Sequence, residues 1–193
     1  MKRRIGIFRG TFDPIHKGHI SFALQAVEQA SLDRVYFLVE TNPTHKINVT
    51  SILDRRKMVS LAIKPYSELH LLELDNVTNG GSQIVPKLRT YFRSALLVFL
   101  MGSDVAKTLP HWPDRAITCE GNEIVIGLRR LDDRAEIVDI FDGLDTRPVY
   151  SMIISAPIPD ASSSNIRVGF DKNTANVNID AKIAEYIKTK QLY

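Results

Sequence analysis

Two histidines near the start of the chain, His16 and His19, have the type and spacing that best suit chemistry on an anion. Residues three apart lie on one face of a helix, so both imidazoles could point at the same group. Gly18 lies between them and would keep that face uncrowded. Backbone N–H groups at a helix start attract phosphate, because the helix dipole is positive there. Together these donors would suit a phosphate that gains negative charge during a reaction.

The segment that must position these histidines is predicted to form a strand, a glycine turn and a helix. The apolar run from Ile5 to Phe8 is typical of a buried strand. Gly10 permits a sharp turn and lets a ligand approach the backbone closely, and Asp13-Pro14 continues that turn. From Lys17 to about residue 30 the apolar residues recur at helical spacing. The histidines would therefore lie at the end of the loop and in the first helical turn.

A serine-rich stretch late in the chain is the second candidate for phosphate chemistry, and its sequence is Ser162-Ser163-Ser164-Asn165-Ile166-Arg167. Hydroxyl groups at a helix start can cap the first turn, and they can also bind phosphate. Arg167 could hold phosphate oxygens through two parallel hydrogen bonds. Taken alone, the stretch is explained more simply as a serine-capped helix.

The overall composition predicts a single domain that covers residues 1–193. The net charge of +3, from 25 basic and 22 acidic residues, suits a small anionic substrate and is too weak to indicate nucleic acid. The only cysteine, Cys119, excludes an internal disulfide and favours a reducing compartment. The chain has no apolar run of membrane-spanning length and no signal-peptide pattern. A cytoplasmic protein without a membrane partner is therefore expected.

Predicted strands and helices alternate along most of the chain. Apolar and β-branched runs predict strands at residues 5–8, 35–39, 69–74, 95–101, 124–128 and 150–154. Helical spacing predicts helices at about 17–30, 51–64, 82–92, 132–141 and 179–187, with a further one starting in the serine-rich stretch. The alternation is typical of an α/β fold with a mainly parallel sheet, where ligands bind beyond the carboxyl ends of the strands.

Two of these helices carry expectations about individual side chains. In the helix at 51–64, Ser51 is the predicted cap, and Arg55-Arg56-Lys57 is predicted to be an exposed face. The predicted apolar side of the same helix consists of Leu53, Met58, Leu61 and Ala62. Ser82 is the predicted cap of the following helix, with Pro86 near its first turn.

The early histidine segment resembles the signature of a known family. The stretch Gly10-Thr11-Phe12-Asp13-Pro14-Ile15-His16-Lys17-Gly18-His19 is similar to the motif of the HxGH nucleotidyltransferases, most of all the bacterial nicotinate mononucleotide adenylyltransferases. The serine-rich stretch resembles the S-S-x-x-I-R element of that family. Pro43-Thr44-His45-Lys46 resembles its P-x-H-K loop, and Met101-Gly102-Ser103-Asp104 with Leu109 and Trp112 resembles its G-x-D…L…W pattern.

The resemblance implies a Rossmann-like, doubly wound fold with helices on both faces of the sheet, and adenylyl transfer from ATP to nicotinate or nicotinamide mononucleotide in NAD biosynthesis. The implied catalytic residues are His16, His19 and Arg167. The implied ATP-binding residues are Gly10, Thr11, Phe12, Gly18, Lys46, Gly102, Asp104, Ser162, Ser163, Ser164 and Ile166. The implied acceptor-binding residues are Arg9, Thr11, His45, Lys46, Ser82 and Trp112. A Mg²⁺ ion would be held by phosphates and water, because no carboxylate cluster is visible.

The chain departs from the family pattern at two places that concern the acceptor. The family usually has Gly-Gly before the threonine, whereas this chain has Arg9-Gly10. Ser82-Gln83-Ile84 keeps the serine of a Ser-Tyr-Thr-like element and loses the other two residues. Two alternatives therefore stay open: a nucleotidyltransferase with a phosphopantetheine-like acceptor, and a nucleotide-binding module without catalysis. The pair Arg129-Arg130 follows a predicted strand and resembles a family arginine, with either residue a possible match.

Overall fold

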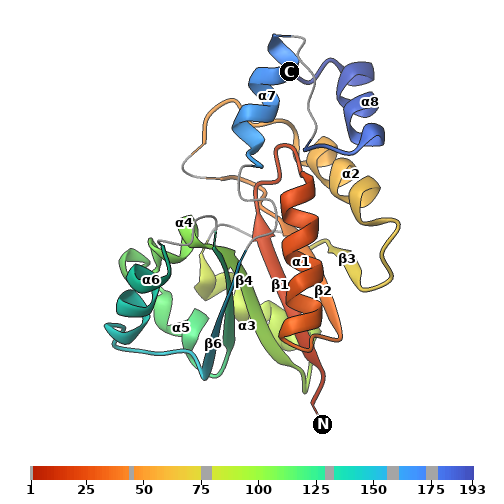
Figure 1. Cartoon of the computed structure of the whole chain (residues 1–193). Coiled ribbons are helices and arrows are strands. Elements are labelled where there is room, and N and C mark those ends of the chain that lie inside the picture. The colour runs from red at the N-terminus through yellow and green to blue at the C-terminus, as the bar shows by residue number, and fades with distance from the viewer. Residues whose placement is uncertain (1, 44–45, 75–79, 129–132, 156–160, 173–177) are drawn as a thin grey trace.

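A parallel sheet forms the centre of the molecule (Figure 1). The computed structural model describes residues 2–43, 46–74, 80–128, 133–155, 161–172 and 178–193. Within this part of the chain six strands form one sheet in the order β3-β2-β1-β4-β5-β6, and every neighbouring pair is parallel. The strands are β1 Arg4–Gly10, β2 Arg34–Val39, β3 Leu69–Leu72, β4 Leu96–Gly102, β5 Glu123–Leu128 and β6 Tyr150–Ser155.

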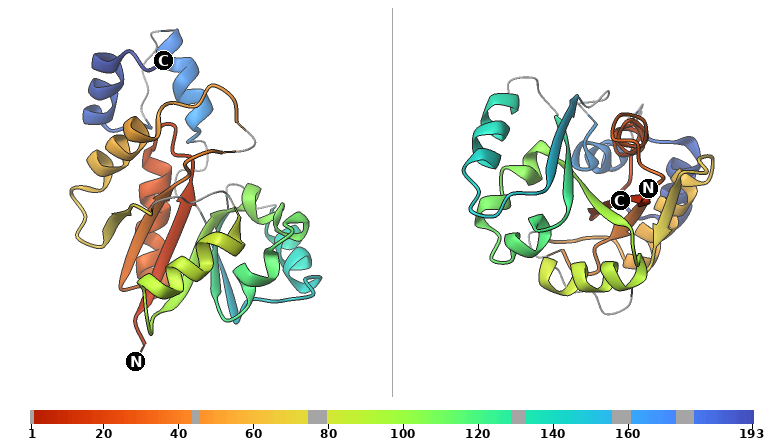
Figure 2. Two further views of the ribbon diagram at one scale, coloured as in Figure 1. Left: turned by 180° about the vertical axis from the view of Figure 1, so that it is seen from behind. Right: turned by 90° about the horizontal axis from the view of Figure 1, so that it is seen from below.

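Helices cover both faces of the sheet, as Figure 2 shows for α1 and α3 on opposite sides. The helices are α1 Lys17–Gln29, α2 Ile52–Ile63, α3 Gly81–Tyr91, α4 Ser103–Ala106, the 3-10 turn η1 Leu109–His111, α5 Arg115–Cys119, α6 Asp133–Asp142, α7 Ser163–Asp171 and α8 Ala181–Lys190. One hydrophobic core joins the sheet to α1, α2, α7 and α8, and a second joins its other face to α3 through α6. This is the doubly wound α/β arrangement that the sequence predicts.

The direction of winding reverses between β1 and β4. After β3 the chain crosses back over the sheet and adds β4 on the other side of β1. In doubly wound sheets the ligand crevice forms at such a reversal, beyond the carboxyl ends of the two strands. Phe8 of β1 pairs with Leu100 of β4, so the glycines that end these strands, Gly10 and Gly102, lie at a similar level.

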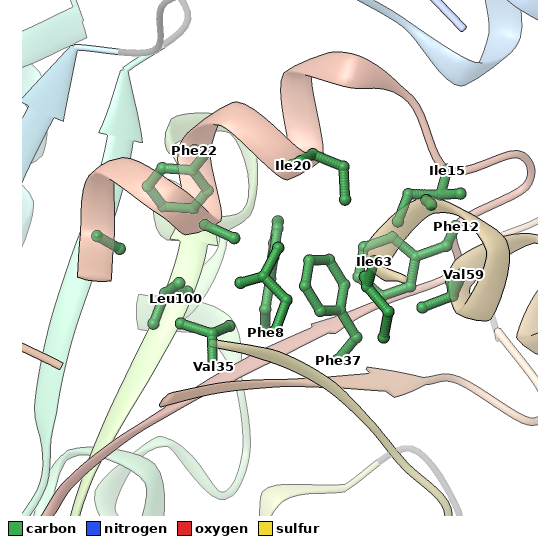
Figure 3. Close-up of a cluster of buried hydrophobic side chains, with 14 of the residues drawn as sticks. Phe8, Phe12, Ile15, Ile20, Phe22, Val35, Phe37, Val59, Ile63 and Leu100 are labelled. Carbon is green, nitrogen blue, oxygen red and sulfur yellow. The ribbon is translucent and has the colours of Figure 1, made fainter. Parts of the chain in front are cut away.

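An aromatic cluster lies directly under this carboxyl edge (Figure 3). The ring of Phe8 lies 5.3 Å from those of Phe12, Phe22 and Phe37, measured between centroids. Phe8 and Phe37 come from neighbouring strands, Phe22 from α1 and Phe12 from the loop between β1 and α1. The floor of the loop is therefore packed apolar surface, which fixes the loop against the sheet.

Two expectations about helix surfaces are wrong. In α2 the side chain of Leu53 is 72% exposed, whereas Arg55 is 1% exposed. Arg55 lies on the helix face that also buries Met58, Val59 and Ala62, and its partners are backbone carbonyl groups described below. The predicted cap Ser51 is confirmed, because its hydroxyl accepts the N–H of Asp54.

The third helix begins before the predicted serine. Gly80 is the residue that precedes the helix and Gly81 its first member, so Ser82 is not the cap. The N–H of Ser82 donates instead to the carboxylate of Asp114 at 2.7 Å. Pro86 consequently lies within the helix and not in its first turn. Among the described residues no helix is both long and apolar enough to cross a membrane.

Candidate active site

The loop between β1 and α1 is shaped by Gly10 and Phe12. Phe12 has a positive φ of 50°, a conformation that side chains other than glycine adopt rarely. Its buried ring folds back under the preceding turn, so that a Cβ on Gly10 would lie 3.0 Å from the ring carbon Cζ. A side chain at position 10 would therefore have to displace this ring, which favours glycine there. The following Asp13-Pro14 peptide bond is cis.

The two histidines lie against each other at the start of α1. Their rings are stacked, with centroids 3.6 Å apart. The backbone N–H of His16 donates to Nδ1 of His19 at 3.2 Å, so the neutral imidazole of His19 carries its proton on Nε2. His16 is only 4% exposed, whereas His19 is half-buried. His19 is thus the member of the pair better able to donate a hydrogen bond to a ligand.

The start of α1 is packed against segments from the end of the chain. The N–H of Lys17, the first of the helix, donates to the carbonyl of Asn178 at 2.9 Å. A Cβ on Gly18 would lie 2.9 Å from the Cβ of Ala161, which precedes α7. Gly18 is therefore needed for the close approach of these two segments, in addition to the uncrowded face that the sequence predicts.

The late serine-rich stretch contacts the early motif directly. Ser163 donates its hydroxyl to the carbonyl of Pro14 at 2.9 Å, and Nη1 of Arg167 donates to the carbonyl of Asp13 at 2.6 Å. Nη2 of Arg167 also donates to the hydroxyl oxygen of Ser164 at 3.3 Å. The structure therefore brings the two predicted phosphate-binding segments together at the same edge of the sheet, with α7 above the end of β1 (Figure 1).

The serines of this stretch do not cap their own helix through their side chains. Ser162 occupies the capping position without a side-chain cap hydrogen bond, and the hydroxyl of Ser163 turns to the other motif. The side chain of Ile166 is buried in the core, so it would not itself contact a ligand. Its N–H donates to the carbonyl of Ser162 as part of the helix.

Arg9 and Glu40 form an ion pair beside the motif. Nη2 of Arg9 lies 3.2 Å from Oε1 of Glu40, and Thr11 donates its hydroxyl to Oε2 at 3.1 Å. Glu40 directly follows Val39, which pairs with Gly10 in the sheet. One carboxylate therefore holds two of the residues predicted to bind the acceptor, and it fixes where the arginine head group lies.

Arg55, which the sequence analysis assigned to the surface, is buried and holds the loops after β1 and β2 together. The guanidinium of Arg55 donates to the carbonyls of Thr11 at 2.9 Å, Glu40 at 2.7 Å, Thr41 at 3.3 Å and Thr50 at 2.8 Å. Burial lowers the pKa of Arg55, while the charges of Asp13 and Glu40 oppose that shift. The loops after β1 and β2 are thus joined through one cation. Arg55 lies at helical spacing from the apolar residues Met58, Val59 and Ala62. This spacing was the signal in the sequence that could have indicated its burial.

The other predicted site residues lie at the end of β4 or in the segments that follow β2 and β4. Gly102 ends β4, and Asp104 is exposed in the first turn of α4. Trp112 is half-buried against the second core and donates its Nε1–H to the hydroxyl of Thr108 at 3.0 Å. Lys46 is exposed. His45 and the pair Arg129-Arg130 lie outside the described residues.

This arrangement is suited to binding and aligning phosphates. Nε2–H of His19, the guanidinium of Arg167 and the hydroxyl groups of Ser162 and Ser164 are groups that can donate hydrogen bonds to an anion. In the described part of the chain no three metal-ligating side chains come together. The donors found there could stabilise charge on a phosphate through alignment and hydrogen bonding.

Comparison with known proteins places the whole chain in one group. Residues 7–169 match the cytidylyltransferase-like family. The chain is 31% identical to a probable nicotinate-nucleotide adenylyltransferase of Neisseria meningitidis, over 99% of this chain and 98% of the relative. It is 32% identical to a protein of the same printed name from Dictyoglomus turgidum, over 98% of this chain and 95% of the relative.

A solved structure shares the fold over nearly the full length. The nicotinic acid mononucleotide adenylyltransferase of Plasmodium falciparum, complexed with NaAD, superposes with a TM-score of 0.82 at 19% identity, covering 99% of this chain and 97% of that one. At this identity the likeness concerns the fold. The family match and the full-length relatives carry the assignment: the chain belongs to the cytidylyltransferase-like nucleotidyltransferases and groups with their nicotinate-nucleotide adenylyltransferase branch.

Proposed function

We propose that this protein transfers the adenylyl group of ATP to nicotinate mononucleotide, releasing pyrophosphate, in the biosynthesis of NAD. The observation that carries the proposal is the contact between the two phosphate-binding segments, in which Ser163 and Arg167 donate to the carbonyls of Pro14 and Asp13. A triphosphate bound at this edge would lie between the histidine pair and Arg167. The full-length relatives named for this activity support the choice of acceptor.

The reaction would be a direct in-line displacement. A phosphate oxygen of the mononucleotide attacks the α-phosphorus of ATP, the new P–O–P bond forms, and the bond to the β-phosphate oxygen breaks. The leaving pyrophosphate takes the electron pair. No covalent enzyme intermediate is required, so the contribution of the protein would be alignment and stabilisation of the charge that develops on the phosphates.

The ATP phosphates would be held by the two motifs. His16 and His19 would bind phosphate oxygens, with His19 nearest the migrating phosphate because it is the more exposed ring and presents Nε2–H. Arg167 and Lys46 would hold the β- and γ-phosphates. The backbone from Gly10 to Phe12 and Gly18 would approach the phosphates closely, and the hydroxyls of Ser162 and Ser164 would add further donors. Ser163 would act by holding the first loop at Pro14.

The nucleoside and the acceptor would extend from the phosphates along the carboxyl edge. Gly102 and Asp104, at the end of the adjacent strand, would contact the adenosine, the carboxylate of Asp104 accepting from a ribose hydroxyl. Ile166 would contribute by anchoring α7 in the core beside the phosphates.

On the acceptor side, Trp112 would stack on the pyridine ring. Arg9 and Thr11, both held by Glu40, would face the mononucleotide together with His45, Lys46 and Ser82.

A Mg²⁺ ion bound to the ATP phosphates would neutralise part of their charge. The described residues bring no cluster of three metal ligands together, so the proposal gives the ion phosphate and water ligands. The chain would act as one nucleotidyltransferase domain on small-molecule nucleotides. The single cysteine supports placing it in the reducing cytoplasm.

The experiment is a pyrophosphate-release assay with ATP, Mg²⁺ and a panel of acceptors: nicotinate mononucleotide, nicotinamide mononucleotide, phosphopantetheine and none. We expect release with nicotinate mononucleotide, together with the adenine dinucleotide in equal amount, and its loss on chelation of the metal. Release only with phosphopantetheine would show a different acceptor. ATP binding without release in any mixture would show a binding module and contradict the proposal.

A further inference from the structure

The last residue of the sequence, Tyr193, is joined to the early phosphate-binding motif. Its hydroxyl donates to Oδ1 of Asp13 at 2.5 Å, across 180 positions of the sequence. Its ring lies 6.3 Å from that of Phe170 in α7, measured between centroids. Tyr193 therefore contacts both the loop of the first motif and the helix that carries the second.

Asp13 is a buried carboxylate and depends on such donors. The residue is 4% exposed, and its second oxygen, Oδ2, accepts the backbone N–H of Thr50 at 3.2 Å. A carboxylate removed from water is costly unless hydrogen bonds replace its hydration. Burial, and then the bond to Asp13, raise the pKa of Tyr193, so its hydroxyl keeps its proton and remains a donor at neutral pH.

The main chain of Asp13 connects this contact to the catalytic edge. Its carbonyl is the acceptor for Nη1 of Arg167. The guanidinium of Arg55 donates to the carbonyls of Thr11 and Thr50. Thr11 lies in the same loop as Asp13, and the N–H of Thr50 donates to the carboxylate of Asp13. A shift of Asp13 would therefore move both the loop backbone and the anchor of Arg167, the two parts that face a triphosphate.

We propose that Tyr193 is a positioning residue, which holds Asp13 so that the loop at Thr11 to Asp13 and the guanidinium of Arg167 face the phosphates of ATP in register. The inference rests on the proposed function, in that the loop is taken to bind ATP. Tyr193 does not touch the phosphates itself; it acts through Asp13.

The chain contains a matched control for this role. Tyr186 of α8 also donates its hydroxyl to a carboxylate, that of Asp54 in α2, at 2.8 Å. This second bond joins two helices and involves neither phosphate-binding motif. Tyr193→Phe and Tyr186→Phe thus each remove a hydroxyl that donates to a carboxylate, although the hydroxyl of Tyr193 also has a hydrogen bond with the side chain of Thr50. Only the first removal should disturb the site.

The experiment compares the wild-type chain, Tyr193→Phe and Tyr186→Phe in three measurements. Calorimetric titration gives the dissociation constant for ATP without acceptor, steady-state assays give kcat and the KM for nicotinate mononucleotide, and thermal unfolding reports the fold. For Tyr193→Phe we expect ATP to bind about tenfold more weakly and kcat to fall about tenfold, the effect of one hydrogen bond to a charged group. The KM for the mononucleotide should change less than twofold.

Tyr186→Phe should leave ATP binding and kcat at the wild-type values. An unchanged ATP dissociation constant in folded Tyr193→Phe, or equal losses in the two variants, would overturn the positioning role. A wild-type chain that binds ATP but makes no dinucleotide would contradict the proposed function alone, because the ATP titration still tests Tyr193. If Tyr193→Phe unfolds below the assay temperature while Tyr186→Phe does not, Tyr193 is structural and the proposal fails.

Discussion

Arg4 at the amino edge of the sheet and Arg55 and Arg167 at its carboxyl edge have opposite kinds of hydrogen-bond partner, while Arg9 at the carboxyl edge pairs with Glu40. At the amino edge Nη1 and Nη2 of Arg4 donate to the two carboxylate oxygens of Glu123 at 3.0 and 2.5 Å, and Nε donates to the carbonyl of Ala30 at 3.1 Å. At the carboxyl edge the hydrogen bonds of Arg55 and Arg167 go to backbone carbonyls and a serine hydroxyl. The first arrangement joins β1 to β5 across β4, and the second holds loops.

This difference predicts that a phosphate would be bound at the carboxyl edge, near Arg167. An arginine in a two-pronged pair with a carboxylate is neutralised, and its charge no longer attracts an anion. An arginine bound to neutral oxygens keeps its charge, so Arg167 contributes positive potential where a triphosphate would lie. Three substitutions test this contrast, from a residue that should act mainly on turnover to one that should affect stability alone.

The largest expected effect is that of His19→Ala on turnover. Removing the ring removes the Nε2–H donor, and loss of one preorganised donor to a transition-state oxyanion lowers kcat by at least ~10². The free energy of unfolding should fall by about 1 kcal/mol, the size of a lost helix cap, because Nδ1 of His19 accepts the His16 N–H. Single-turnover kinetics and urea unfolding measure the two quantities. A loss of less than tenfold in kcat would remove His19 from the catalytic role.

Arg55→Lys should reduce both turnover and stability. A lysine ammonium cannot reach four carbonyls from the two loops after β1 and β2 in the way that the planar guanidinium does. The carbonyls left without partners should cost about 3 kcal/mol in the free energy of unfolding. Because the loop at Thr11 moves with them, kcat should fall as well. Denaturant unfolding followed by assays well below the transition separates the two effects, and an intact kcat would show that the support is structural only.

Glu123→Gln should have the smallest effect and none on catalysis. The substitution removes the charge of the carboxylate while keeping its shape, so the pair with Arg4 is weakened at the amino edge. Because Arg4 remains partly exposed to water, the free energy of unfolding should fall by only about 1 kcal/mol. The KM values and kcat should match those of the wild type. A tenfold change in kcat would show that the two edges are coupled, contrary to the contrast drawn above.

The parts of the site that follow from local pattern could be predicted from the sequence. The apolar run at 5–8, the glycine turn and the helical spacing after Lys17 predict β1, its loop and α1. Because both motifs follow strands of a parallel sheet, their meeting at one edge could also be anticipated. These features depend on periodicity and on strand direction, both of which a single sequence records.

The supports beneath the site could not be predicted in the same way. An arginine is assigned to the surface by default, and only the apolar neighbours of Arg55 at helical spacing suggested otherwise. The bond between Asp13 and Tyr193 joins opposite ends of the sequence and has no local signature. The start of α3 was misplaced for a similar reason, since Asp114, far along the chain, supplies the acceptor expected from Ser82.

The contact of α7 with the first loop has a consequence for the order of events during synthesis. Residues 163 and 167 are translated roughly 150 positions after the loop that they hold, which at ribosomal speed is on the order of 10 s. The strands β1, β2 and β3 can pair on the nascent chain during that interval. The contact between α7 and the loop after β1, however, forms only when α7 emerges and docks. A nascent chain would therefore acquire half its sheet well before its two motifs can meet.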